Sequence, residues 1–324
     1  MTVELGTKTM QAGPDATTAA VRSLAAGGLV AFPTETVSGL GADARNGEAV
    51  ARLYAAKGRP RFNPLIAHVA DAAAARKLAV FDANAAKLAD AFWPGPLTLV
   101  LPKRPDCPLS ELALAGLDSI ALRVPAHPVA RELIAAFGSA IVAPSANRSG
   151  HVSPTTAAHV LADLRGRIDL IVDGGPCDVG VESTIVSCLG GTPSLLRPGG
   201  LPRVDVEHLL GVALTQTPNG LIDEDAPLAP GMLASHYAPK AALRLDAQEA
   251  HSGETLLAFG PAAEGALNLS PRGDLVEAAA NLFSHLRTLD ASGARTIAVM
   301  SVPREGLGEA INDRLARAAA PRTP

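Results

Sequence analysis

The sequence is poor in aromatic residues, in cysteine and in long apolar runs. Aromatic residues make up 3% of the 324 residues, so the core must be built from alanine, valine, leucine and isoleucine. The three cysteines form no C-x-x-C pair, which favours a reduced chain over a disulfide-bonded one. The N-terminal segment lacks the apolar core of a signal peptide, and no later run is long enough to span a membrane. We therefore expect a cytoplasmic protein that does not enter a membrane.

Charge and missing motifs exclude further classes of function. The formal net charge is −4 at pH 7, which argues against a broad basic surface for stable nucleic-acid binding. The eight histidines contain no H-x-x-x-H pair, so we expect no metal site made by the protein alone. No G-x-S-x-G elbow, Walker A loop or G-x-G-x-x-G fingerprint occurs, which argues against a hydrolase triad and the commonest nucleotide-binding loops.

Short apolar runs alternate with helical patterns along the chain, which predicts the α/β class. Strands are predicted at residues 29–32, 63–69, 96–103, 119–125, 139–147, 169–175 and 182–188, and helices at 48–58, 82–95, 129–138 and 154–166. The pattern resumes after residue 240, with strands at 242–246, 255–260 and 296–302 and helices at 274–290 and 308–319. We predict a first domain over 12–198, a Pro- and Gly-rich linker over 199–239 with one short helix at 204–211, and a small α/β domain over 240–324.

Polar residues follow several predicted strands, where open α/β sheets commonly bind ligands. Ordinary turn chemistry explains the same residues equally well. His68 could be a satisfied core residue or a functional one. Arg123, inside an apolar strand, needs either an acid within the protein or a bound carboxylate.

Three basic residues, Lys57, Arg59 and Arg61, lie two apart in "KGRPRFNPLIAH". An extended chain around Pro60 would point all three one way and form a phosphate clamp. The alternative is a set of cations that only complements a helix C-terminus. Two later segments are equally open: "APSANRSG" could cradle a phosphate or cap a helix, and "SHYAPK" could close over a nucleotide or anchor the linker.

Several segments together resemble the YrdC-type threonylcarbamoyl-AMP synthases, in the longer two-domain branch. The resemblance covers nearly the whole chain and rests on "FPTETVSGLGADA", "KGRPRFNPLIAHV", "WPGPLTLVL", "IALRVPAHP", "APSANRSG", "GVESTIVS", "LLRPG", "GMLASHYAPK" and "GLGEAINDRLARAA". It implies a YrdC-like twisted mixed sheet with flanking helices, a linker that crosses the active site, and a Rossmann-like C-terminal domain. One departure is Ser38, where the family usually has tyrosine.

The resemblance implies that L-threonine, bicarbonate or CO2, and ATP react to give threonylcarbamoyl-AMP and pyrophosphate. Mg²⁺ would accompany the ATP, and a separate tRNA threonylcarbamoyl-transferase complex would use the product. Lys57 and Arg59 would act catalytically on the phosphates. Positions that match the threonine site are Thr36, His68, Arg123, Ala143 and Ser183. Positions that match the ATP site are Arg59, Asn63, Ser119, Ser145, Asn147, Ser153, Arg197 and Tyr237.

Two other functions compete with this interpretation. YrdC-like domains also occur in carbamoyl transfer for metallocentre maturation, but the acylphosphatase-like and zinc-finger segments expected there are missing. A non-catalytic RNA-binding module would suit the fold, but the net charge and the few aromatic residues argue against it.

Overall fold

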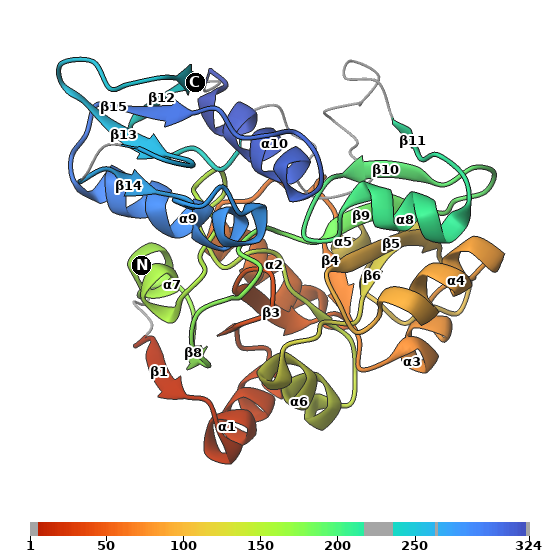
Figure 1. Ribbon diagram of the computed structural model, residues 1–324. Coiled ribbons are helices and arrows are strands. Elements are labelled where there is room, and N and C mark those ends of the chain that lie inside the picture. Colours follow the sequence, from red (N-terminus) through yellow and green to blue (C-terminus); the bar gives the residue numbers. More distant parts are fainter. Residues whose placement is uncertain (1–5, 217–235, 263–264, 322–324) are drawn as a thin grey trace.

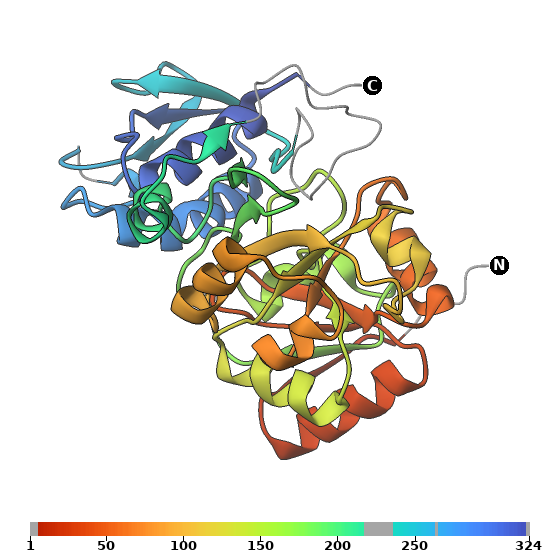
Figure 2. The same ribbon diagram turned by 90° about the vertical axis from the view of Figure 1, so that its right-hand side faces the viewer.

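The structure is a computed structural model that describes residues 6–216, 236–262 and 265–321 (Figure 1). It contains a large sheet in the order β1-β8-β2-β3-β7-β4-β6-β5-β9-β10-β11 and a smaller sheet in the order β12-β15-β13-β14. Figures 1 and 2 show the smaller sheet and its two helices packed together as one unit beside the larger sheet. The α/β class with a small C-terminal α/β domain is confirmed.

The large sheet mixes parallel and antiparallel strands, so it needs both hairpin and crossover connections. Its strands are β1 (Lys8–Gln11), β2 (Val30–Phe32), β3 (Gly39–Asp43), β4 (Ile66–His68), β5 (Leu97–Pro102), β6 (Ser119–Arg123), β7 (Ile141–Val142), β8 (Leu170–Asp173), β9 (Thr184–Ser187), β10 (Ser194–Arg197) and β11 (Thr215–Gln216). Parallel pairing of β4 with β6 sets His68 opposite Arg123, so both polar side chains reach the same edge.

Helices cover both faces of this sheet. They are α1 (Pro14–Ala25), α2 (Gly47–Lys57), α3 (Ala72–Arg76), α4 (Ala83–Phe92), α5 (Glu111–Leu114), α6 (Pro128–Phe137), α7 (Ala157–Leu164) and α8 (Arg203–Leu210). Alternate residues around β2 face opposite sides, as the period of a strand requires. Leu29 and Ala31 enter the core that includes α2 and α4, whereas Val30 and Phe32 pack with α1 and α6.

Helix α2 holds Lys57 in its last turn, as predicted, and the chain turns again at residues 61–62 within the basic segment. Asn46 caps its start by accepting hydrogen bonds from the backbone N–H groups of Glu48 and Ala49. Gly58 ends it in the left-handed conformation, with φ of 62°, which glycine adopts without steric cost. Lys57 is therefore helical, and Arg61 is exposed while Lys57 and Arg59 are buried. The prediction that all three point one way is wrong.

The C-terminal unit is a parallel sheet covered by two amphipathic helices. It comprises β12 (Ala242–Ala247), β13 (Glu254–Ala258), β14 (Leu267–Asn268), α9 (Leu275–Ala291), β15 (Thr296–Met300) and α10 (Leu307–Ala319). Its core also takes in Val37, Val152 and Val181 of the first domain. At Gly180 a Cβ would lie 2.3 Å from the carbonyl oxygen of Ala279, so the close approach of α9 requires glycine there.

Most elements predicted from the sequence are present, and the differences are local. The predicted strand at 29–32 begins at Val30, and the short helix expected at 204–211 is α8. The sequence did not predict α1, α3, α5, β1, β3, β10, β11 or β14. Residues 217–235 of the predicted linker lie outside the described residues, so the domain limits stay a prediction. Within the described ranges, no helix is long and apolar enough to cross a membrane.

Candidate active site

Residues predicted for the threonine site and residues predicted for the ATP site meet around one small cavity at the edge of the large sheet. Its volume is about 50 Å³. The predicted residues that line it are Thr36, Arg59, His68, Arg123, Ala143, Ser145, Ser183, Arg197 and Tyr237. They follow β2 and β7, end β4, β6 and β10, precede β9, or come from outside the sheet. The topology of the sheet, rather than nearness in sequence, brings them together.

Arg123 has an acidic partner within the protein. Its Nη2 donates to Oε1 of Glu35 at 2.7 Å, and its Nε donates to the Gly95 carbonyl at 3.3 Å. The other carboxylate oxygen of Glu35 accepts from the backbone N–H of Ala126 at 3.0 Å, at the approach to α6. Burial alone would raise the pKa of Glu35, but the charge and hydrogen bond of Arg123 lower it. Glu35 is thus an ionised carboxylate that fixes Arg123 at the cavity.

His68 is uncharged at neutral pH. It is 2% exposed, and its Nδ1 lies 3.2 Å from the carbonyl oxygen of Ile66. Burial, followed by the nearby charge of Arg123, lowers its pKa to about 3. The imidazole therefore adds polarity to the cavity without adding positive charge.

Two further arginines supply positive charge to the cavity. Arg59 Nη2 donates to Asn63 Oδ1 at 2.6 Å and to the Pro64 carbonyl at 3.0 Å. Arg197 donates to the carbonyl of Ser183 at 2.8 Å and to its Oγ at 3.2 Å. Burial lowers the pKa of both arginines, that of Arg59 to about 10, so both stay charged at neutral pH. Arg197 is 4% exposed, so it is a buried residue of the site.

Lys57 is near the cavity but does not line it. Its Nζ donates to the backbone carbonyls of Ser145 and Asn147, both at 2.5 Å. Burial, followed by the charge of Arg59, lowers its pKa well below the usual range. Lys57 thus ties the end of α2 to the turn after β7, which presents Ser145 to the cavity.

Four predicted residues also lie outside the lining. Asn63 holds Arg59, and Ser153 donates to Glu182 at 2.5 Å. Asn147 Nδ2 donates to the carbonyls of Arg148 and His151, both at 2.8 Å. Ser119 starts β6, four residues before Arg123 along the same strand. The first three therefore support cavity residues or their turns, whereas Ser119 lies at the far end of the strand.

Tyr237 brings the C-terminal unit to the cavity. It is 1% exposed, has a φ of 62°, and stacks on Phe283 of α9 with ring centroids 5.6 Å apart. The backbone beside it is fixed on both sides: His236 N–H donates to the Arg317 carbonyl at 3.3 Å, and Ala238 N–H donates to the Gly150 carbonyl at 2.8 Å. Within the described residues, the "SHYAPK" segment thus both anchors the chain and lines the site.

Glu182 is a cavity residue that the sequence did not reveal. Its Oε1 accepts from Ser153, and its Oε2 accepts from Arg314 of α10 at 2.7 Å. Burial would raise the pKa of Glu182, but Arg314 and then Arg197 lower it. The only available signal was an acid next to Ser183, and its partner lies 132 residues further along the chain.

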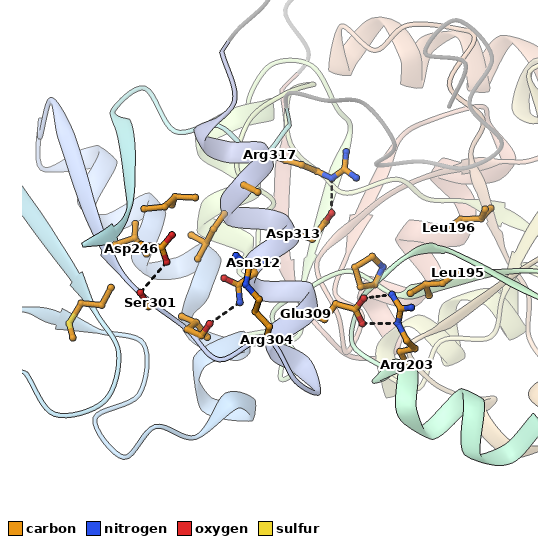
Figure 3. Close-up of a pocket in the computed structure, with 17 residues that line it drawn as sticks. Leu195, Leu196, Arg203, Asp246, Ser301, Arg304, Glu309, Asn312, Asp313 and Arg317 are labelled. Carbon is orange, nitrogen blue, oxygen red and sulfur yellow. Dashed lines mark hydrogen bonds and ion pairs between the residues drawn. The ribbon is translucent and has the colours of Figure 1, made fainter. Parts of the chain in front are cut away.

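A larger cavity of about 620 Å³ lies between the first domain and α10 (Figure 3). Arg203, at the start of α8, forms an ion pair with Glu309 across it. On α10, Oδ1 of Asp313 accepts a hydrogen bond from Nε of Arg317 at 3.0 Å. None of the predicted site residues lines this cavity.

Ser38 is buried away from the small cavity. Its Oγ lies 3.8 Å from the sulfur of Cys177, and it is not among the lining residues. The serine that stands where the family usually has tyrosine therefore does not itself contact this cavity.

Comparison with known proteins identifies the family. The model Sua5_yciO_yrdC, described as "Telomere recombination", matches residues 22–199, and the model described as "Threonylcarbamoyl-AMP synthase, C-terminal domain" matches residues 203–320. A threonylcarbamoyl-AMP synthase of Bacillus subtilis is 44% identical over 314 residues, covering 91% of this chain and 90% of that protein. A relative of the same name from Schizosaccharomyces pombe is 38% identical over 344 residues, covering 90% and 84% respectively.

A solved structure shows the same arrangement over nearly the whole chain. The crystal structure of P. abyssi Sua5 complexed with L-threonine has a TM-score of 0.88 and 38% identity, covering 97% of each chain. The match includes both the large sheet and the C-terminal unit. The chain therefore belongs to the two-domain Sua5 family of threonylcarbamoyl-AMP synthases.

Proposed function

We propose that the residues around the small cavity belong to the active site of this nucleotidyltransferase, where L-threonine, bicarbonate or CO2, and ATP give threonylcarbamoyl-AMP and pyrophosphate. One observation carries the proposal. The buried guanidinium of Arg59 has only neutral oxygen acceptors among the described residues, and it faces the same cavity as Arg123 and Arg197. A buried cation without an acid partner is costly, and a bound anion would offset that cost.

The side of the cavity formed by Thr36, His68, Arg123, Ala143 and Ser183 is proposed to bind threonine. Arg123 keeps donor capacity for a carboxylate after its bonds to Glu35 and Gly95. The hydroxyls of Thr36 and Ser183 are hydrogen-bonded to those of Thr34 and Thr98 and would bond the substrate hydroxyl. A site built to bond a hydroxyl strongly rejects analogues that lack it.

The other side is proposed to bind ATP. Arg59 and Arg197 would pair with phosphate oxygens, and Ser145 and Tyr237 would complete the contacts. Asn63 and Ser153 would act through Arg59 and Glu182, to which they are bonded. Lys57 and Asn147 would hold the turn that carries Ser145. Direct contact of Lys57 with the phosphates, and any ATP contact by Ser119, stay predictions.

The chemistry needs positive charge at fixed positions. The amine of threonine first attacks carbon dioxide and loses a proton, forming an N-carboxylate. An oxygen of that carboxylate then attacks the α-phosphorus while the bond to pyrophosphate breaks. Both reactants are anions, so the arginines reduce their repulsion and stabilise the charge that develops on the phosphate oxygens. The same charges disfavour the ammonium form of threonine and so favour the nucleophilic amine.

A Mg²⁺ ion is proposed to accompany ATP. Glu182 is the only carboxylate that lines the cavity among the described residues, and both its oxygens already accept hydrogen bonds. This donor set suits an ion held by the phosphates rather than by side chains. When bound, the ion would neutralise charge on the leaving pyrophosphate.

The product is proposed to pass to a tRNA threonylcarbamoyl-transferase complex in the cytoplasm. This chain would not need to bind tRNA stably, which agrees with its net charge of −4.

The test is to mix the purified protein with ATP, Mg²⁺, bicarbonate and L-threonine, to follow pyrophosphate, and to detect the adenylate by mass spectrometry. Serine and amino-acid-free reactions are the controls. We expect threonine-dependent pyrophosphate together with the adenylate. Pyrophosphate that does not depend on an amino acid, without the adenylate, would contradict the proposal.

A further inference from the structure

Arg314 is a buried arginine of the C-terminal unit that reaches the wall of the small cavity. It lies on α10 and is 0% exposed. Its Nε donates to Oε2 of Glu182 at 2.7 Å, and its Nη1 donates to Oδ2 of Asp313 at 2.6 Å. Its guanidinium carbon lies 5.2 Å from the centre of the Tyr237 ring. One side chain thus contacts two residues that line the cavity.

The ion pair between Arg314 and Glu182 neutralises the one carboxylate among the described residues that line the cavity. Glu182 is 7% exposed and lies among residues proposed to bind ATP. Without Arg314, an unpaired carboxylate would face a site for a polyanion, and like charges in a dry cavity repel strongly. The ion pair removes that repulsion and leaves the oxygens of Glu182 bonded to Arg314 and Ser153.

The contact with Tyr237 fixes an aromatic wall. A cation near a ring face is attracted to it, and Arg314 holds one side of the ring while Phe283 stacks at 5.6 Å. Tyr237 also has a positive φ, a strained conformation that its surroundings must enforce.

Domain docking alone does not require this arrangement. Arg203, on the helix α8 that packs into the core of the large sheet, already pairs with Glu309 of α10 at the larger cavity in Figure 3. A buried ion pair contributes little net stability compared with apolar packing, and Nη2 of Arg314 has no hydrogen-bond partner among the described residues. Docking of the C-terminal unit onto the first domain therefore does not explain why the chain buries the Glu182–Arg314 ion pair.

We propose that Arg314 is a positioning residue for ATP, supplied by the C-terminal unit, which neutralises Glu182 and holds Tyr237 against the nucleotide end of the cavity. The inference rests on the proposed function, because Ser153, Arg197 and Tyr237 are assigned to ATP there.

The test compares Arg314→Met, the double variant Glu182→Gln/Arg314→Met and the control Arg203→Met in the full-length protein. The KM for ATP, the KM for threonine and thermal unfolding are measured for each. Arg314→Met leaves the Glu182 carboxylate unpaired, so we expect the KM for ATP to rise roughly tenfold or more, with little change for threonine. The double variant removes that charge, so its KM for ATP should return most of the way to the wild-type value. Arg203→Met should change neither KM, even if it lowers the unfolding temperature.

Four results with folded variants would overturn the inference. They are an unchanged KM for ATP in Arg314→Met, an equal rise in both KM values, no recovery in the double variant, and the same ATP effect in Arg203→Met. If Arg314→Met does not fold, Arg314→Gln, which also removes the positive charge beside Glu182, takes its place in the same comparison with the same expected rise in the KM for ATP. If neither folds while Arg203→Met does, Arg314 serves folding and the inference fails. A wild-type protein that makes no adenylate would instead refute the proposed function.

Discussion

Replacing Arg59 by methionine tests the anion site, with Arg61→Met as a matched control two residues along. Arg59 is 9% exposed, and its bonds to Asn63 and Pro64 aim its guanidinium at the cavity. Hydrogen bonds to a charged group contribute about 1.5–3 kcal/mol. Loss of one such bond to phosphate in the transition state should therefore lower kcat/KM for ATP by roughly 10- to 150-fold. Arg61 is exposed, so its replacement should leave kcat/KM within about twofold.

The assay is threonine-dependent pyrophosphate release over a range of ATP concentrations. Thermal unfolding of each variant shows whether the loss of activity comes with loss of the fold. Arg59→Met also removes a buried charge, so we expect only a modest change in stability. A folded Arg59→Met protein with wild-type kcat/KM for ATP would refute the reasoning, and so would an equal loss in Arg61→Met.

Further predictions concern the ion pair, pH, specificity and the metal. Glu35→Gln should destabilise the protein by about 3 kcal/mol in urea unfolding, since it leaves Arg123 charged and buried, and adding Arg123→Met should recover part of the loss. Burial lowers the pKa of His68 to about 3 in the folded protein, so the unfolded chain takes up its proton first and stability should fall as the pH drops from about 6.5 toward 3. In unfolding measured against pH, His68→Gln should flatten that slope, and an unchanged slope would contradict the assignment. Ser38→Ala should leave the ratio of threonine to serine turnover unchanged, because Ser38 does not line the cavity. Removal of Mg²⁺ by a chelator should abolish pyrophosphate release and its return should restore it, whereas full activity in the chelator would exclude the metal.

The sequence predicted the parts of the site that local pattern determines. Strand ends such as "IAH" and "IALR" show their polar residues directly, and the sheet then sets His68 opposite Arg123. The end of α2 at Gly58 was also predictable, because glycine is favoured there.

The rest depended on contacts between distant segments. No local signal shows that Glu35 neutralises Arg123, or that Lys57 bonds the carbonyls of Ser145 and Asn147. The expected common direction of Lys57, Arg59 and Arg61 failed because the chain turns at residues 61–62, which leaves Arg61 exposed. Likewise β10 is a short strand directly before Pro198 and Gly199, so its sequence pattern is typical of a turn. The sequence therefore did not indicate that Arg197 is buried.

Incorporation of labelled bicarbonate tests the central claim most directly. The wild-type protein would be given ATP, Mg²⁺, L-threonine and ¹³C-bicarbonate, and the adenylate would be fragmented in the mass spectrometer. We predict that the label lies in the carbonyl group between the threonine nitrogen and the α-phosphate. An adenylate without the label, in which the threonine carboxylate is joined directly to AMP, would contradict the account.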